Sequence, residues 1–202
     1  MQPKMNPAEP SYAELQQQLK QAETMAERTL GELVALQKSQ LPKQYADTPG
    51  IVQIQHQLQF MLKHAQRHNS GFALMFVQID QFKAIRDKHD AAFTKKIIEL
   101  TLQHLNAAVR QCDSISQLAD DQFLVLVTDV SRIYDTVLVA EKLLQKLDTL
   151  HRFTLQIPNL TISIGISHFP EDGNDALLLI ERATAAMLHA QHRGGNQFSL
   201  LR

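Results

Sequence analysis

Residues 114–128 read SISQLADDQFLVLVT. Its pattern predicts two short strands joined by a tight turn, Ala119-Asp120-Asp121-Gln122. Residues 123–127 have the length and the β-branched and aromatic character of a strand that is buried on both faces. Two adjacent carboxylates repel each other, and the geometry of a turn requires neither of them. The turn is therefore either an ordinary solvated turn or a rigid mount for a metal or phosphate site.

The composition limits the classes of protein to consider. The chain has 202 residues, enough for one domain of ordinary size and an extension. Its 20 basic and 21 acidic residues nearly cancel, so we expect neither nucleic acid nor an anionic membrane as a partner. Cys112 is the only cysteine, which favours a reducing compartment. There is no apolar run near the ~20 residues of a membrane span and no apolar signal-peptide core in residues 1–10, so we expect a cytoplasmic protein.

The first 45 residues predict a segment separate from the globular domain. Residues 1–10 contain prolines and polar residues and predict a flexible tail. Residues 11–45 predict a helix, with Ser11 and Glu14 as a capping box. Its apolar positions alternate at spacings of three and four, as in a coiled-coil seam: Tyr12, Leu15, Leu19, Ala22, Ala26, Thr29, Leu33 and Leu36. We expect a homodimer through residues 12–36; an amphipathic helix that packs on its own domain is the alternative.

Residues 46–202 predict one globular domain. The apolar periodicity predicts helices at 51–68, 91–109, 130–150 and 175–192. Strands are expected at 72–79, in the hairpin of 114–128, and at 153–157, 161–169 and 197–201. The apolar run at 72–79 predicts the central strand. This order of elements predicts an α+β fold, in which one mixed sheet is built around a central hairpin and helices cover its faces.

Several short motifs stand in one order along this domain. Residues 79–87, IDQFKAIRD, are similar to a strand-end motif DxDxFKxIND, and Arg110 to Asp113 form an RxxD motif. Residues 161–167 and 169–173, TISIGIS and FPEDG, are similar to TxSIGIA…FPEDG, and residues 182–187 and 194–196 are similar to RADxAM and GRN. With Ala119–Phe123 at the place of the signature, the ordered set over about 49–201 resembles the GGDEF family. The resemblance implies a nucleotidyl-cyclase-like fold and a relation to the diguanylate cyclases, which join two GTP into cyclic di-GMP.

The resemblance also assigns the catalytic positions, and the chain departs from the family at most of them. The family's reaction needs magnesium held by carboxylates. The resemblance places the first metal-binding Asp at Gln78, so that Asp121 is the only retained metal candidate. It places the paired glycines of the signature at Ala119 and Asp120, and the acid that follows Asp121 at Gln122. An acidic side chain at the second glycine position puts bulk and negative charge beside a triphosphate.

The remaining nucleotide-binding positions differ as well. The resemblance places the guanine-reading side chains at Arg86 and Lys95, and the phosphate-binding Lys and Arg at Gln191 and Gly195. It therefore implies a degenerate, catalytically inactive GGDEF domain without a metal cofactor. A weak cyclase, which alone would need Mg²⁺, is the less favoured alternative.

The RxxD motif is retained at the family's inhibitory-site spacing. The resemblance implies that Arg110 contacts phosphate and guanine of cyclic di-GMP, that Asp113 accepts from a guanine edge, and that Lys142 supplies a further cation. Guanidinium groups suit phosphates and the O6/N7 edge of guanine. The alternative is that Arg110 lies at a helix C-terminus, where cations are favoured, and that Asp113 is a turn residue. We expect a cyclic di-GMP receptor that acts through a protein partner, or else a nucleotide-independent scaffold.

Overall fold

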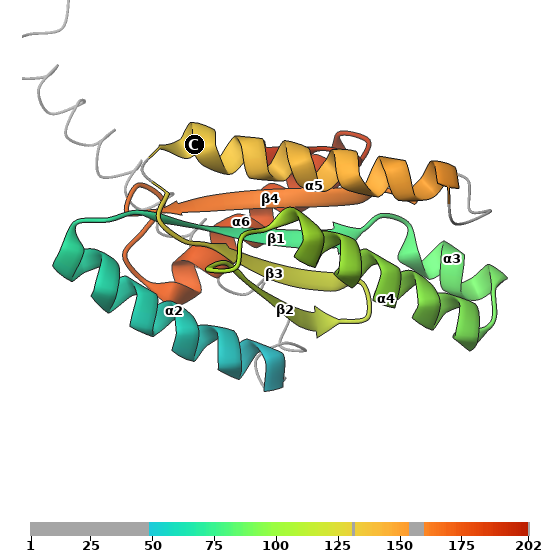
Figure 1. The fold of residues 1–202 in the computed structure, drawn as a ribbon, viewed down its shortest axis with the longest axis horizontal. Helices are drawn as coiled ribbons and strands as arrows, with labels where there is room; N and C mark the ends of the chain where they lie inside the picture. The colour runs from blue at the N-terminus through green and yellow to red at the C-terminus, as the bar shows by residue number, and fades with distance from the viewer. Residues whose placement is uncertain (1–48, 131, 154–159, 202) are drawn as a thin grey trace, which may run out of the picture. The chain divides into compact units, whose positions relative to one another are not determined.

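The computed structural model describes residues 49–130, 132–153 and 160–201. The predicted tail at 1–10 and the predicted coiled-coil helix at 11–45 lie outside the described residues. The described part contains a five-stranded sheet in the order β2-β3-β1-β4-β5 (Figure 1). Its strands are β1 Phe72–Ile79, β2 Ser114–Ala119, β3 Gln122–Val127, β4 Ile162–Phe169 and β5 Phe198–Leu200.

The pairing of the strands confirms a mixed sheet. β1 is antiparallel to β3 on one side and to β4 on the other, β2 is antiparallel to β3, and β5 is parallel to β4. β1 is the central strand, as its apolar run predicts. The β2–β3 hairpin pairs with this central strand through β3, and β2 lies at the edge of the sheet. The register of β2 shifts between Gln117 and Ala119, which marks a bulge in this edge strand.

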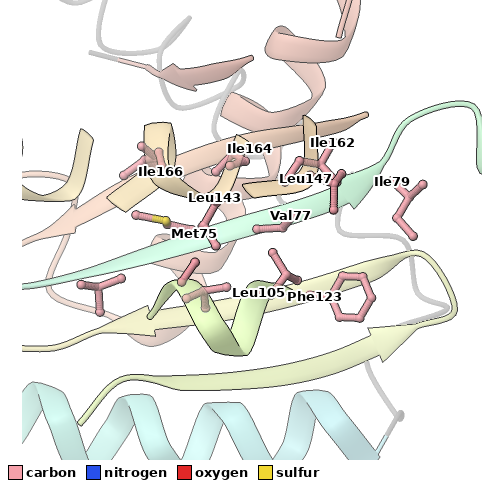
Figure 2. Close-up of a cluster of buried hydrophobic side chains, with 14 of the residues drawn as sticks. Met75, Val77, Ile79, Leu105, Phe123, Leu143, Leu147, Ile162, Ile164 and Ile166 are labelled. Atoms are coloured by element: carbon pink, nitrogen blue, oxygen red, sulfur yellow. The ribbon is translucent and has the colours of Figure 1, made fainter. Parts of the chain in front are cut away.

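Helices cover both faces of the sheet, because successive side chains of a strand point to opposite faces. They are α2 Pro49–His68, α3 Phe82–Lys88, α4 Ala91–Ala108, α5 Ile133–Phe153 and α6 Ala176–His192. Met75 and Val77 of β1 pack in one core cluster with Leu105 of α4 and Leu143 of α5 (Figure 2). The alternate residues of β1 (Phe72, Leu74 and Phe76) pack in a second core cluster with α2 and α6.

Side-chain caps mark the beginnings of two helices, and two elements differ from those predicted from the sequence. Asp90 caps α4 by accepting from the backbone N–H of Phe93, and Asp175 caps α6 by accepting from those of Leu177 and Leu178. The sequence did not predict α3, which has seven residues, of which Phe82 is buried. Phe153, expected in a strand, is the last residue of α5, and the rest of the strand expected at 153–157 lies outside the described residues.

Gly165 in the middle of β4 allows α6 to pack directly against the sheet. A Cβ atom at this position would lie 1.9 Å from the carbonyl oxygen of Ala183 and 2.1 Å from the backbone nitrogen of Met187. Both atoms belong to the backbone of α6, so no side-chain rotation relieves the overlap. Gly165 is therefore required for the approach of the helix to the strand.

We expect Gly165→Ala to destabilise the domain by about 3 kcal/mol or more, because the strand and the helix must separate to admit one methyl group. Chemical denaturation followed by circular dichroism measures the loss. Gly194→Ala is the control: a Cβ there has no neighbour within 4 Å, and its cost comes from a backbone φ of +112° alone. Equal losses in the two variants would contradict the role given to Gly165.

Candidate functional site

The hairpin turn lies against the end of the central strand. Asp120 and Asp121 form the two-residue turn between β2 and β3, with Asp120 exposed and Asp121 half-buried. The backbone N–H of Ile79 donates to the carbonyl oxygen of Asp121 at 2.9 Å. Gln78 of β1 stands opposite Gln122 of β3 in the register of the sheet. The structure therefore brings together Gln78, Asp121 and Gln122, which the motif assigns to the metal and signature positions.

A side-chain hydrogen bond joins the two positions that the resemblance assigns to metal-binding carboxylates. The Nε2 group of Gln78 donates to Oδ2 of Asp121 at 2.8 Å. An amide N–H that faces a carboxylate is a hydrogen-bond donor and offers no lone pair to a cation. Magnesium prefers several oxygen ligands, usually including one or two carboxylates. No group of three His, Cys, Asp or Glu side chains suited to a metal ion occurs within 49–130, 132–153 and 160–201. This donor set does not fit a magnesium site.

Asp80 ties three segments together beside this turn. Its carboxylate accepts from the hydroxyls of Thr161 at 2.8 Å and Ser163 at 2.6 Å, and from the backbone N–H of Asn196 at 3.0 Å. Gly195 has a φ of +73°, and a Cβ there would lie 2.9 Å from Oδ2 of Asp80. The sequence analysis placed Asp80 in a motif but did not recognise this structural role. The hydroxyl residues at alternate positions 161 and 163 were the available signal, since such residues share one face of a strand.

An open pocket of about 730 Å³ lies between the hairpin and the helices α3 and α4. Arg86 and Lys95, the positions assigned to guanine recognition, both line it, and so does Asp120 of the turn. Figure 1 shows α3 and α4 beside the turned end of the hairpin. Gln78, Asp121, Gln191 and Gly195 do not line this pocket. The structure thus separates Arg86, Lys95 and Asp120, which line the pocket, from the half-buried and hydrogen-bonded pair of Gln78 and Asp121.

The RxxD motif forms a turn between α4 and β2. Asp113 accepts from the backbone N–H of Arg110 at 2.8 Å and from that of Thr128, just after β3, at 3.0 Å. These bonds are those of a structural turn residue, the alternative that the sequence left open. The Arg110 side chain is exposed. Lys142 of α5 donates to the carbonyl oxygen of Ala108 at 2.7 Å, so the structure places this cation beside the motif.

The RxxD turn and the signature turn lie at opposite ends of one hairpin. Asp113 directly precedes β2 and Asp120 directly follows it, and β2 has six residues. At about 3.3 Å per residue the two turns are roughly 20 Å apart. A ligand that fills one site leaves the other open.

A five-stranded mixed sheet with helices on both faces and a hairpin turn at the end of its central strand defines a nucleotidyl-cyclase-like domain. The family model described as "Diguanylate cyclase, GGDEF domain" matches residues 49–197, and the chain belongs to this family. The match covers almost the whole range over which the motifs occur.

Known proteins of the family are similar to this chain over most of its length. The bifunctional diguanylate cyclase/cyclic di-GMP phosphodiesterase MucR of Pseudomonas aeruginosa is 28% identical over 150 residues, which is 74% of this chain and 22% of MucR. The GGDEF domain of TpbB (YfiN) from Pseudomonas aeruginosa superposes with a TM-score of 0.68 at 23% identity, covering 75% of this chain and 88% of that one. The coiled coil and GGDEF domain of DgcB from Caulobacter crescentus, in complex with c-di-GMP, has a TM-score of 0.65 at 16% identity and covers 93% of this chain and 99% of that one. The two structures share the fold with this chain, and the chain spans about a fifth of the length of MucR.

The helices of the described residues do not include a membrane span. None of them has both the length and the apolar content that crossing a bilayer requires.

The Gln78–Asp121 hydrogen bond leads to a prediction that a carboxylate at position 78 would allow a metal ion to bind. We expect Gln78→Asp to destabilise the metal-free domain by roughly 1–3 kcal/mol, because two carboxylates then face each other. Mn²⁺ should bind this variant and restore its thermal stability. Gln78→Asn, which keeps a neutral amide, is the matched control and should respond to Mn²⁺ as little as the unmodified protein. Thermal unfolding and the electron paramagnetic resonance signal of free Mn²⁺ measure both effects; an equal gain in all three proteins would refute the assignment.

Proposed function

We propose that this protein is a catalytically inactive GGDEF signalling protein that binds cyclic di-GMP through Arg110 and Asp113 and acts in the cytoplasm through a protein partner. The observation that supports the receptor function is the geometry of the RxxD turn. Arg110 is exposed beside a turn that Asp113 holds in place, and Lys142 lies next to it. The turn needs no rearrangement to present its guanidinium group to a ligand.

The contacts of Asp113 are compatible with ligand binding. Each oxygen of a carboxylate has about two lone pairs, and the backbone N–H groups of Arg110 and Thr128 approach different oxygens. The hydroxyl of Thr128 and the thiol of Cys112 also approach Oδ1, at 3.4 Å and 3.9 Å, so the acceptor capacity for N–H groups of a guanine edge lies on Oδ2. The guanidinium of Arg110 can donate in pairs to a phosphate or to guanine O6 and N7. DgcB shows that a domain of this fold occurs in complex with c-di-GMP.

The loss of catalysis rests on several substitutions that act on different parts of the reaction. Gln78 bonds to Asp121 where the family places a metal, and Asp120 stands at a glycine position beside the nucleotide. Arg86 and Lys95 replace the guanine-reading side chains. Loss of one preorganised electrostatic group typically lowers a rate by roughly 10²–10³. Such losses are not additive, but here they affect metal binding and base recognition together.

A nucleotide-independent scaffold is the second candidate, and the same turn favours it. Asp113 stabilises the connection from α4 to β2 and the end of β3 without any ligand. In this case the RxxD residues are kept for folding, and a protein surface carries the function. Binding of cyclic di-GMP distinguishes the two candidates.

We expect cyclic di-GMP to bind with a dissociation constant in the micromolar range or tighter, roughly −8 kcal/mol or better. Arg110→Ala should weaken binding by about 1.5–3 kcal/mol, the scale of a hydrogen bond to a charged group. Lys142→Ala should weaken it less, because this ammonium is exposed and already donates to Ala108. Arg67→Ala, which removes an exposed arginine of α2, is the control and should have no effect. Isothermal titration calorimetry measures all four proteins, and no saturation at about 100 µM ligand would leave the scaffold function.

We also expect the purified protein to form no cyclic di-GMP from GTP with Mg²⁺ or Mn²⁺, because no pair of carboxylates is available at Gln78 and Asp121. Chromatography of the reaction mixture after prolonged incubation measures the product. Product that disappears in Asp121→Ala would show that the site is active and that the proposed inactivity is wrong.

A further inference from the structure

Two cationic side chains line the pocket between the hairpin, α3 and α4. Arg86, from α3, and Lys95, from α4, both line it. Guanidinium and ammonium groups carry five and three N–H donors and no acceptor. The pocket therefore favours a ligand that brings acceptor oxygens.

The volume of the pocket and the α4 side chains that line it suit a small molecule. Its volume of about 730 Å³ lies inside the range of roughly 300–1,000 Å³ that is usual for ligand sites. Ala91, Thr94 and Ile98 recur on one side of α4 and supply small and apolar surface. His89 contributes an imidazole at the start of this wall, stacked on the ring of Phe93 with 4.2 Å between centroids. A compact ligand can thus contact apolar surface and cationic groups at once.

The acidic residues of the pocket define where an anion can lie. Glu99 pairs with Lys95 at 3.8 Å, but the two side chains are 65% and 78% exposed, and such pairs contribute little. A ligand oxyanion can replace Glu99 as the partner of Lys95. Asp120 on the hairpin side repels an anion. The favoured position is therefore on the Arg86, His89 and Lys95 side, away from the turn.

We propose that this pocket binds the phosphate or carboxylate group of a small molecule, held by Arg86 and Lys95. The site is distinct from the RxxD turn at the other end of the hairpin. Its occupation does not depend on cyclic di-GMP binding at Arg110.

Two probes and three variants test this proposal at constant ionic strength. Inorganic phosphate and citrate represent the two sources of oxyanion, and two-dimensional NMR of the full chain follows the amide signals of residues 91–99. We expect saturable shifts with at least one probe. Lys95→Asp should weaken binding at least about tenfold, the scale of a lost charge-assisted contact. Lys96→Asp is the matched control, because Lys96 is an exposed neighbour on α4 that does not line the pocket, and it should change affinity less than about twofold.

Asp120→Asn should have the opposite effect and increase the affinity for the anion. Removal of the like charge should tighten binding by about two- to fivefold, whereas a merely structural effect of the turn would weaken it or leave it unchanged. Saturation by phosphate alone identifies a phosphate site, and saturation by citrate alone identifies a carboxylate site. The proposal is overturned if neither probe saturates, or if Lys96→Asp weakens binding as much as Lys95→Asp does. Because Arg110 is unchanged in every variant, these outcomes are independent of the cyclic di-GMP titration.

Discussion

Close backbone contact between β4 and α6 determines how the neighbouring elements of the domain are arranged. Gly165 stands opposite Phe76 of the central strand, and the backbone of α6 occupies the space that a side chain at Gly165 would fill. The position of α6 fixes the loop that follows it, which places the backbone N–H of Asn196 on the carboxylate of Asp80 at the end of β1. A packing requirement in the middle of β4 thereby determines the arrangement of residues at the end of the central strand β1. Gly195, one of the positions assigned to nucleotide binding, belongs to this frame, because a Cβ there would lie 2.9 Å from Oδ2 of Asp80.

The elements that depend on local pattern were predictable from the sequence. The apolar run at 72–79 is the buried central strand, and the predicted face of the helix at 51–68 is buried at Ile54, Leu58, Leu62 and Ala65. The order of strands in the sheet was not predictable, because periodicity describes which face of a strand is buried and not which strand is its neighbour. α3 was missed for a related reason: seven residues with one buried side chain give no period to detect.

The candidate sites, too, could be predicted from the sequence only in part. The motifs located the signature turn, the RxxD turn and the positions of Arg86 and Lys95, since each motif is read from adjacent residues. The bond from Gln78 to Asp121 depends on the register of β1 with β3, and the ties of Asp80 join β1 to β4 and to the loop before β5. Such long-range partners cannot be read from the spacing of residues. They nevertheless decide whether a carboxylate is available to a ligand or already holds the fold together.

The two edges of the sheet limit how this domain can associate with other chains. An exposed, regular edge strand presents unpaired backbone groups and is a template for pairing between molecules. β5 has only three residues, and β2 carries polar side chains at Ser114, Ser116 and Gln117 and a bulge before Ala119. A bulge twists the strand and interrupts the row of groups that a second strand would have to match. Neither edge suits extension of the sheet into an intermolecular one, so this architecture resists aggregation by strand addition and leaves specific association to its helices and turns.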